Sequence, residues 1–193
     1  KIIESILSLK AETHNFPTTV EPFNGASTGS GGEIRDRMAG GIGSIPLAGT
    51  AVYMTSYPRL DSGNERVFNR EWEDQIEERK WKYQTPEQIL VKASNGAADF
   101  GNKFGQPLIN GSLLTYEGHT ANGLYAYDRA VMLAGGIGFA NSAHAEKKEP
   151  QVGDSLVLLG GDNYRIGMAG GSVSSVDTGA LSAQLELSAI QRA

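Results

Sequence analysis

The sequence predicts an α/β fold of the α+β type, with helices on one face of a mixed and mostly antiparallel sheet. Four segments have the apolar alternation or β-branched content of strands: residues 3–11, 47–55, 107–116 and 129–139. Two segments between them have helix signals: residues 32–38 and 85–100. The order strand, helix, strand, helix, strand, strand indicates one layer of helices packed on one sheet.

The first strand leads directly into a polar, glycine-rich stretch. Residues 13–31 are dominated by Thr, Asn, Pro and Gly, and we predict a loop there. The first helix is expected to begin at Gly32, because Glu33 and Asp36 suit the positive N-terminal end of a helix. A run of glycines is then expected to end it: Gly40, Gly41 and Gly43.

The second helix has a complete start signal. Thr85 can cap it, Pro86 suits the first helical position, and Gln88 can complete a capping box. The helix is expected to end at Gly101 or Gly105.

Two connecting segments are polar. Residues 58–82 carry many charges of both signs, which predicts a solvated insertion with a short helix; partner docking is the alternative. A polar loop containing Gly118 and Gly123 is expected to join the last two strands.

We predict a first domain over residues 1–145 and the start of a second, truncated α/β domain over 150–193. Residues 140–153 have the composition of a linker. Residues 154–160 are predicted as a short buried strand. The second glycine-rich stretch, 160–171, follows this strand and suits either phosphate binding or a tight turn.

Composition excludes several classes of protein. The net charge of −5 argues against a nucleic-acid surface, and the lack of cysteine excludes disulfides and thiolate metal sites. No apolar run approaches the roughly 20 residues of a membrane span. We therefore expect a cytoplasmic protein with no membrane or nucleic-acid partner. Because the chain starts at Lys1, inside a strand pattern, we interpret it as a piece of a longer protein.

The residues that suggest chemistry lie on and after the first strand. If residues 9–13 are extended, Lys10, Glu12 and His14 point to one face. Glu12 and Asp36 are hard oxygen ligands of the kind that binds Mg²⁺ beside phosphate oxygens. His14 could move a proton or bind a developing charge. The alternatives are an exposed Lys10–Glu12 ion pair and a histidine with only a structural hydrogen bond.

The glycines of the predicted loop suit phosphate binding. Gly25, Gly29, Gly31 and Gly32 precede the helix start, so that backbone N–H groups could approach phosphate oxygens. The pattern lacks the Gly-Lys-Ser/Thr ending of a Walker loop, and the glycines do not follow a strand directly as in a dinucleotide fingerprint. A flexible glycine linker is the alternative.

Several motifs, in order, resemble the phosphoribosylformylglycinamidine synthase (formylglycinamide ribonucleotide amidotransferase) family in its large single-chain form. They are Lys10-x-Glu12-Thr13-His14-Asn15-x-Pro17, Gly25-Ala26-x-Thr28-Gly29-x-Gly31-Gly32-x-Ile34-Arg35-Asp36, Ala93-Ser94-Asn95-Gly96-x-x-Asp99-Phe100-Gly101-Asn102, Asn163-Tyr164-Arg165-Ile166-Gly167-Met168 and Ala189-Ile190-Gln191-Arg192. The family's fold resembles the N-terminal domain of aminoimidazole ribonucleotide synthetase, so the resemblance implies that fold for residues 1–145.

The resemblance also implies an activity and a set of roles. ATP would phosphorylate the amide oxygen of formylglycinamide ribonucleotide, and glutamine-derived ammonia from a glutaminase domain would displace phosphate from the resulting iminophosphate. His14 matches the catalytic histidine, and Glu12 and Asp36 match Mg²⁺ ligands. Positions assigned to ATP are Lys10, Gly25, Ala26, Ser27, Thr28, Gly29, Ser30, Gly31, Gly32, Glu33, Ile34, Arg35 and Asp36. Positions assigned to the substrate are Thr13, His14, Asn15, Phe16, Arg35 and Gln191.

One departure from the family pattern concerns Phe16, where many relatives have a second histidine. A phenyl ring cannot donate a hydrogen bond, so a polar contact from this position is in doubt.

The resemblance further implies that this segment is inactive without the remaining domains of its polypeptide. An isolated fragment would expose a sheet edge and form a homodimer or aggregate. The rival enzymes of the superfamily, aminoimidazole ribonucleotide synthetase and selenophosphate synthetase, are disfavoured by the Glu12-Thr13-His14-Asn15 motif. A non-catalytic nucleotide-binding or scaffold module of the same fold is the rival from another class.

Overall fold

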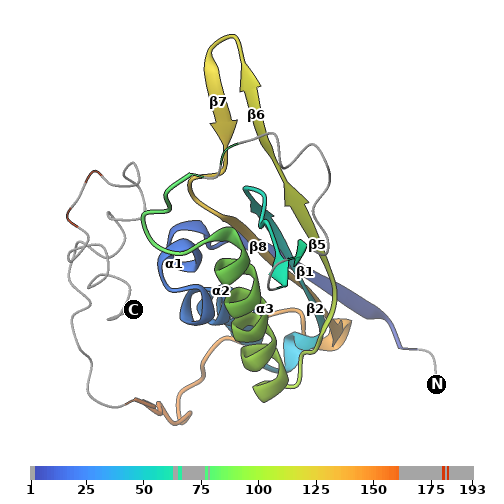
Figure 1. The fold of residues 1–193 in the computed structure, drawn as a ribbon. Coiled ribbons are helices and arrows are strands. Elements are labelled where there is room, and N and C mark those ends of the chain that lie inside the picture. The colour runs from blue at the N-terminus through green and yellow to red at the C-terminus, as the bar shows by residue number, and fades with distance from the viewer. Residues whose placement is uncertain are drawn as a thin grey trace.

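A computed structural model describes residues 3–62, 65, 66, 77, 79–160, 180 and 182. Its centre is a four-stranded sheet in the order β1-β8-β2-β5 (Figure 1). The strands are β1 (Ser5–Thr13), β2 (Ile45–Thr55), β5 (Leu108–Thr115) and β8 (Val131–Asn141). β8 runs antiparallel to both β1 and β2, whereas β5 is parallel to β2. The predicted mixed, mostly antiparallel sheet is therefore confirmed.

Three helices cover one face of this sheet: α1 (Asn15–Val20), α2 (Pro22–Met38) and α3 (Pro86–Lys103) (Figure 1). The prediction of a loop over residues 13–31 is wrong, because α1 and most of α2 occupy it. Pro22 at the first helical position starts α2. The glycines that suggested a loop serve close packing instead. A Cβ on Gly25 would lie 2.4 Å from the carbonyl carbon of Pro17.

The two longer helices pack against each other through a second glycine contact. On α3, a Cβ at Gly96 would lie 1.9 Å from the carbonyl oxygen of Phe23 on α2. The predicted capping box of α3 is confirmed, with Gln88 N–H donating to Thr85 Oγ1 at 3.2 Å and Thr85 N–H donating to Gln88 Oε1 at 3.1 Å. α3 continues through Gly101 to Lys103, and Gly105 follows with φ +71°.

The core between the helices and the sheet consists mostly of small side chains. Its buried members are Ala26, Ala51, Tyr53, Ala93, Ala97, Met132 and Ala134. Alanines and glycines let α2 and α3 lie close to the strands, so small shifts of one helix are transmitted to the sheet directly. The glycine run after α2 is confirmed as its end, since a short 3₁₀ turn, η1 (Gly41–Gly43), leads into β2.

The predicted polar loop between the last two strands is a hairpin formed by β6 (Glu117–Thr120) and β7 (Gly123–Ala126), which projects beyond the sheet (Figure 1). A buried carboxylate lies at its base. Glu117 is 2% exposed. One of its carboxylate oxygens forms an ion pair with Arg59 Nη2 at 2.6 Å, and the other lies 3.6 Å from Arg79 Nε. Arg59 and Arg79 belong to the segment between β2 and α3, so one carboxylate ties both ends of that segment to the hairpin.

The remainder of the segment 58–82 contains β3 (Asp61–Ser62) and β4 (Glu65–Arg66), which pair with each other. The short helix predicted for this segment has no counterpart in its described part. Its other residues, 63–64, 67–76 and 78, lie outside the described chain.

After β8 the chain forms a short 3₁₀ turn, η3 (Ser142–His144), and then extends away from the domain. The strand predicted over residues 154–160 is absent: this segment is extended and exposed, and Leu156 and Leu158 bury almost none of their surface. A strand needs a partner, and none of the described residues pairs with this segment. The glycine-rich stretch after Gly160 lies outside the described residues, and the division into two domains stays a prediction.

Within the described residues, no helix combines the length and apolar character that crossing a membrane requires.

Candidate functional site

The candidate site is a ladder of contacts between β1 and α2. Along β1, Lys10 and Glu12 turn toward the helices and are half-buried, whereas Leu9, Ala11 and Thr13 face the opposite side. His14 follows the strand and lies against α2 as well. Opposite them, α2 presents Gly29, Gly32 and Asp36, which share one side of the helix. The two elements therefore meet residue by residue.

Each contact of this ladder depends on a small side chain or on charge. A Cβ on Gly29 would lie 2.9 Å from the Cβ of His14. A Cβ on Gly32 would lie 2.1 Å from Oε1 of Glu12. At the far end, Lys10 Nζ makes an ion pair of 2.7 Å with Asp36 Oδ2. The sequence motif of β1 and the glycine motif of α2 are thus in direct contact.

Lys10 joins the two predicted metal carboxylates. Its ammonium lies 2.7 Å from Asp36 and 3.7 Å from Glu12, so both acids approach one positive charge. The hydrogen bond that Lys10 donates to Asp36 raises the pKa of Lys10 above its ordinary value, with smaller contributions from the charges of Asp36 and Glu12. That the two carboxylates share a metal ion stays a prediction. The ion pair between Lys10 and Glu12, given above as the alternative, is present.

His14 is held by its backbone and partly buried. Its N–H donates to the Met132 carbonyl at 2.9 Å, and its own carbonyl accepts from Thr18 Oγ1 at 2.5 Å. Burial lowers the pKa of the imidazole below 6.5, an effect opposed by a backbone hydrogen bond with Gly25 and by the charge of Glu12. Arg35 lowers this pKa further. The imidazole is therefore neutral near pH 7, and the charges that act on it are those of Glu12 and Arg35.

Two further predicted residues on α2 remain accessible. Arg35 and Asp36 are exposed, and the guanidinium of Arg35 lies 5.7 Å from the centroid of the Phe100 ring on α3. Gly31 provides the space for this arrangement, because a Cβ there would lie 2.6 Å from the Phe100 ring. Arg35 is consequently an available cation beside His14 and Asp36.

The prediction of a glycine-rich loop that binds phosphate is wrong, because these glycines are helical. Gly25 to Gly32 lie inside α2, where backbone N–H groups are already bonded; the Gly25 N–H, for example, donates to the Glu21 carbonyl at 2.6 Å. Helical N–H groups are free only in the first turn. Seven of the positions assigned to ATP are buried in packing: Gly25, Ala26, Gly29, Ser30, Gly31, Glu33 and Ile34. Ser27, Thr28 and Gly32 are half-buried.

The structure contradicts one of the substrate positions, Phe16, and leaves the others as predictions. Phe16 is 3% exposed and lies under the guanidinium of Arg129, 5.2 Å from its ring centroid, so it is a core residue rather than a surface contact. Asn15 uses its side-chain oxygen to accept from the Met132 N–H at 3.0 Å. Thr13 is exposed but faces away from the ladder. Gln191 lies outside the described residues.

Sequence reasoning missed a buried polar ring beside the ladder. Arg37 donates to Glu33 Oε2 through Nε at 3.0 Å and through Nη2 at 2.6 Å. Gln106 completes the ring by accepting from Arg37 and donating to the other oxygen of Glu33. The i,i+4 spacing of Glu33 and Arg37 could have indicated their ion pair. Gln106, far away in sequence, has no local signal.

No group of three or more potential His, Cys, Asp or Glu ligands is close enough together to hold a metal ion among the residues that the structure describes. The pair Glu12 and Asp36 nevertheless fits Mg²⁺, which proteins often bind with one or two carboxylates while phosphate oxygens and waters complete the shell. The fit rests on the approach of both acids to one cation, the Lys10 ammonium.

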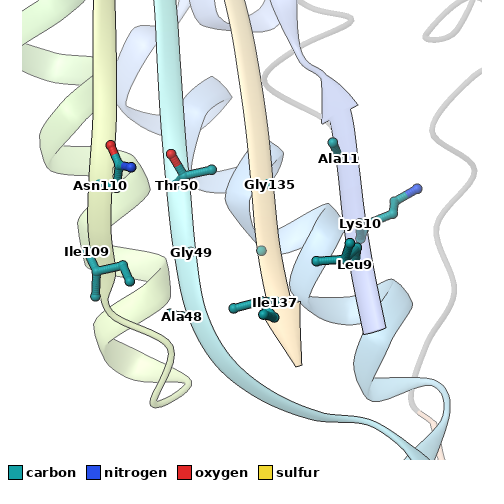
Figure 2. A pocket seen from close by; sticks show the side chains of 11 residues that line it. Leu9, Lys10, Ala11, Ala48, Gly49, Thr50, Ile109, Asn110, Gly135 and Ile137 are labelled. Atoms are coloured by element: carbon teal, nitrogen blue, oxygen red, sulfur yellow. The ribbon is translucent and has the colours of Figure 1, made fainter. Parts of the chain in front are cut away.

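Among the residues that the structure describes, no helix covers the opposite face of the sheet. An open pocket of about 450 Å³ lies on this face. Figure 2 shows three of the apolar side chains that line it, Leu9 of β1, Ile109 of β5 and Ile137 of β8. Leu9 is 79% exposed and Ile109 is 71% exposed. Apolar patches of this kind are typical of surfaces that bind a partner or a ligand.

Curated proteins match this chain over nearly its whole length. A scan against protein-family models finds none that matches. Among curated proteins, the chain is 41% identical over 192 residues to phosphoribosylformylglycinamidine synthase of Dictyostelium discoideum, covering 98% of this chain and 14% of that protein. It is 42% identical over 183 residues to the probable phosphoribosylformylglycinamidine synthase of Arabidopsis thaliana, covering 94% of this chain and 13% of that protein.

Among solved structures, T. maritima PurL complexed with ATP aligns with 74% of this chain and 18% of its own, at a TM-score of 0.46 and 23% identity. The chain spans only 14% and 13% of the length of the two curated relatives. Over nearly its whole length, this chain is homologous to one segment of the phosphoribosylformylglycinamidine synthase family.

Proposed function

We propose that this chain is part of the synthetase site of a phosphoribosylformylglycinamidine synthase, a ligase of purine biosynthesis. The reaction converts formylglycinamide ribonucleotide, ATP and ammonia into formylglycinamidine ribonucleotide, ADP and phosphate. The observation that carries the proposal is the ladder, in which Lys10, Glu12 and His14 of the recognised motif meet Gly29, Gly32 and Asp36 of α2. Packing alone does not require four charged or titratable groups at one contact.

In the proposed reaction, the amide oxygen of the substrate attacks the terminal phosphorus of ATP and ADP leaves. Ammonia, released from glutamine in another domain, then adds to the carbon of the iminophosphate and phosphate departs. An amide oxygen is a weak nucleophile, so positioning and neutralisation of charge supply most of the catalysis. Lys10 and Arg35 are the cations available for the phosphoryl oxygens.

Glu12 and Asp36 are the residues that would hold Mg²⁺, which when bound neutralises phosphate charge. His14, neutral near pH 7 because of its lowered pKa, can take or share a proton of the substrate amide or of the attacking ammonia. These roles follow from charge and position on the ladder.

The partners in this proposal are the remaining domains of the same polypeptide, among them the glutaminase that supplies ammonia. The bare apolar face of the sheet is proposed as the surface that a second sheet covers. In the isolated chain, that second sheet comes from another copy, which gives a homodimer. A location in the cytoplasm stays a prediction.

The test uses the full-length enzyme with ammonium chloride replacing glutamine, so that the glutaminase is bypassed. Glu12→Gln and Asp36→Asn are each expected to lower kcat/KM at least 100-fold at limiting Mg²⁺ and to raise the Mg²⁺ concentration needed for half-maximal rate. His14→Ala is expected to abolish amidine formation without changing the melting temperature by more than a few degrees. Glu4→Gln, an exposed acid just before β1, is the matched control and should behave as wild type.

Wild-type Mg²⁺ dependence in both carboxylate variants would overturn the assignment of the ladder. Nucleotide binding with no amidine formation by the wild-type enzyme would instead support the rival, a non-catalytic nucleotide-binding module.

A further inference from the structure

Gln106 lies in the short connection between α3 and β5 and is completely buried. Its main chain is fixed by α3, because its N–H donates to the Gly101 carbonyl at 2.9 Å. A Cβ on Gly101 would lie 2.4 Å from the Gln106 carbonyl oxygen, so the two segments are in direct contact. The position of the Gln106 side chain is therefore set by α3 and not by solvent.

The side-chain amide of Gln106 connects both members of a buried ion pair. Its Nε2 donates to Glu33 Oε1, and its Oε1 accepts from Arg37 Nη2. Glu33 and Arg37 are 1% and 4% exposed. Only an amide offers one donor and one acceptor of the required size at this point. A carboxylate there would repel Glu33, and a thioether would leave charged groups without hydrogen-bond partners.

The ring of Glu33, Arg37 and Gln106 lies directly beside the ladder. A Cβ on Gly136 of β8 would lie 2.3 Å from Arg37 Nη2, and a Cβ on Gly49 of β2 would lie 2.8 Å from Gln106 Nε2. In the sheet, Gly136 pairs with Lys10 on one side and with Gly49 on the other. These two glycines allow the buried ring to touch the sheet next to Lys10.

We propose that Gln106 is a positioning residue for the Lys10–Glu12–Asp36 group. The stretch of α2 that carries Glu33 and Arg37, less than two turns long, also carries Gly32 and Asp36, the contacts of Glu12 and Lys10. By fixing Glu33 and Arg37 against the sheet, Gln106 fixes the rotation and depth of this stretch. Gln106 touches no ladder residue itself and acts through α2. This inference rests on the proposed function, because it assigns Gln106 to that same site.

The experiment compares three variants of the full-length enzyme: Gln106→Glu, Gln106→Met and the double variant Gln106→Glu with Glu33→Gln. The double variant exchanges acid and amide and keeps one carboxylate, one amide and one guanidinium in the ring. Gln106→Glu is expected to raise the Mg²⁺ concentration for half-maximal rate at least tenfold, at a temperature well below its melting point. The double variant is expected to return this value to within threefold of wild type.

A purely structural role would lower the melting temperature of the single variants and leave the Mg²⁺ requirement of the folded enzyme unchanged. That result, or a double variant that fails to recover Mg²⁺ dependence while recovering stability, would overturn the proposal. If Gln106→Met does not fold, the exchange variant still decides. Failure of the proposed function is distinguishable, because Glu12→Gln would then leave Mg²⁺ dependence at the wild-type value as well.

Discussion

Gly32→Ala is the sharpest test of the ladder, because it should separate stability from activity. Gly32 lies inside α2, where replacing glycine by alanine stabilises a helix by about 1 kcal/mol. The added Cβ would lie 2.1 Å from Glu12 Oε1. This is about 1.4 Å inside the optimal separation of two heavy atoms. The neighbour is the end of a flexible side chain, so the carboxylate yields and the helix does not.

The magnitude follows from that displacement. If the Glu12 carboxylate moves by about 1 Å, a loss of about 100-fold in kcat/KM is expected, as for other misplaced catalytic groups. A 100-fold loss corresponds to about 2.7 kcal/mol of transition-state stabilisation. The variant should therefore be as stable as wild type or more stable, while its rate falls and its Mg²⁺ requirement rises.

The assay is amidine formation by the full-length enzyme over a range of Mg²⁺ concentrations, combined with urea unfolding. Val91→Ala, at an exposed position in the middle of α3, is the control for helix propensity and should leave the rate unchanged. A Gly32→Ala enzyme with the wild-type Mg²⁺ requirement would refute the idea that Gly32 exists to admit Glu12. A large loss of stability would show that the carboxylate cannot move aside.

Two further predictions concern His14 and the bare face of the sheet. Because burial holds the pKa of His14 below 6.5, the unfolded chain binds the proton more readily, so the free energy of unfolding should fall as pH drops below about 6.5. His14→Gln should remove that part of the pH dependence in urea unfolding at pH 7.5 and 5.5; an unchanged slope would contradict the assignment. The isolated chain should sediment as a dimer, and Leu9→Lys combined with Ile109→Lys should make it monomeric. A wild-type monomer at high concentration would count against the proposed sheet contact.

The fold was largely predictable from local pattern. A few residues are enough to recognise strands with alternating apolar residues, and the same holds for the helix with a complete capping box at Thr85. The first part of α2, residues 22–31, was missed because glycine has a low helix preference, and its glycines are explained by close tertiary contacts with Pro17, His14 and Glu12. A stretch with the composition of a loop can thus be a helix when its glycines face another backbone or a functional side chain.

The charged residues of the candidate site could be predicted from the sequence, whereas the tertiary contacts around them could not. Lys10, Glu12, His14 and Asp36 could be selected because their chemistry and spacing on a strand are visible in the sequence. The burial of Phe16 and the hydrogen bond from Asn15 to β8 could not be predicted, because both depend on tertiary structure. The segment 154–160 was predicted as a strand from composition, but a strand also requires a neighbour to pair with.

The buried carboxylate at the base of the β6–β7 hairpin has a consequence for how this protein tolerates change. Arg59 and Arg79 both approach Glu117, so the two ends of the stretch between them are held at one place. A change of length or sequence between these two arginines is therefore expected to leave the anchoring charges and the ladder in position. This makes the stretch a suitable position for grafting a reporter or a binding peptide.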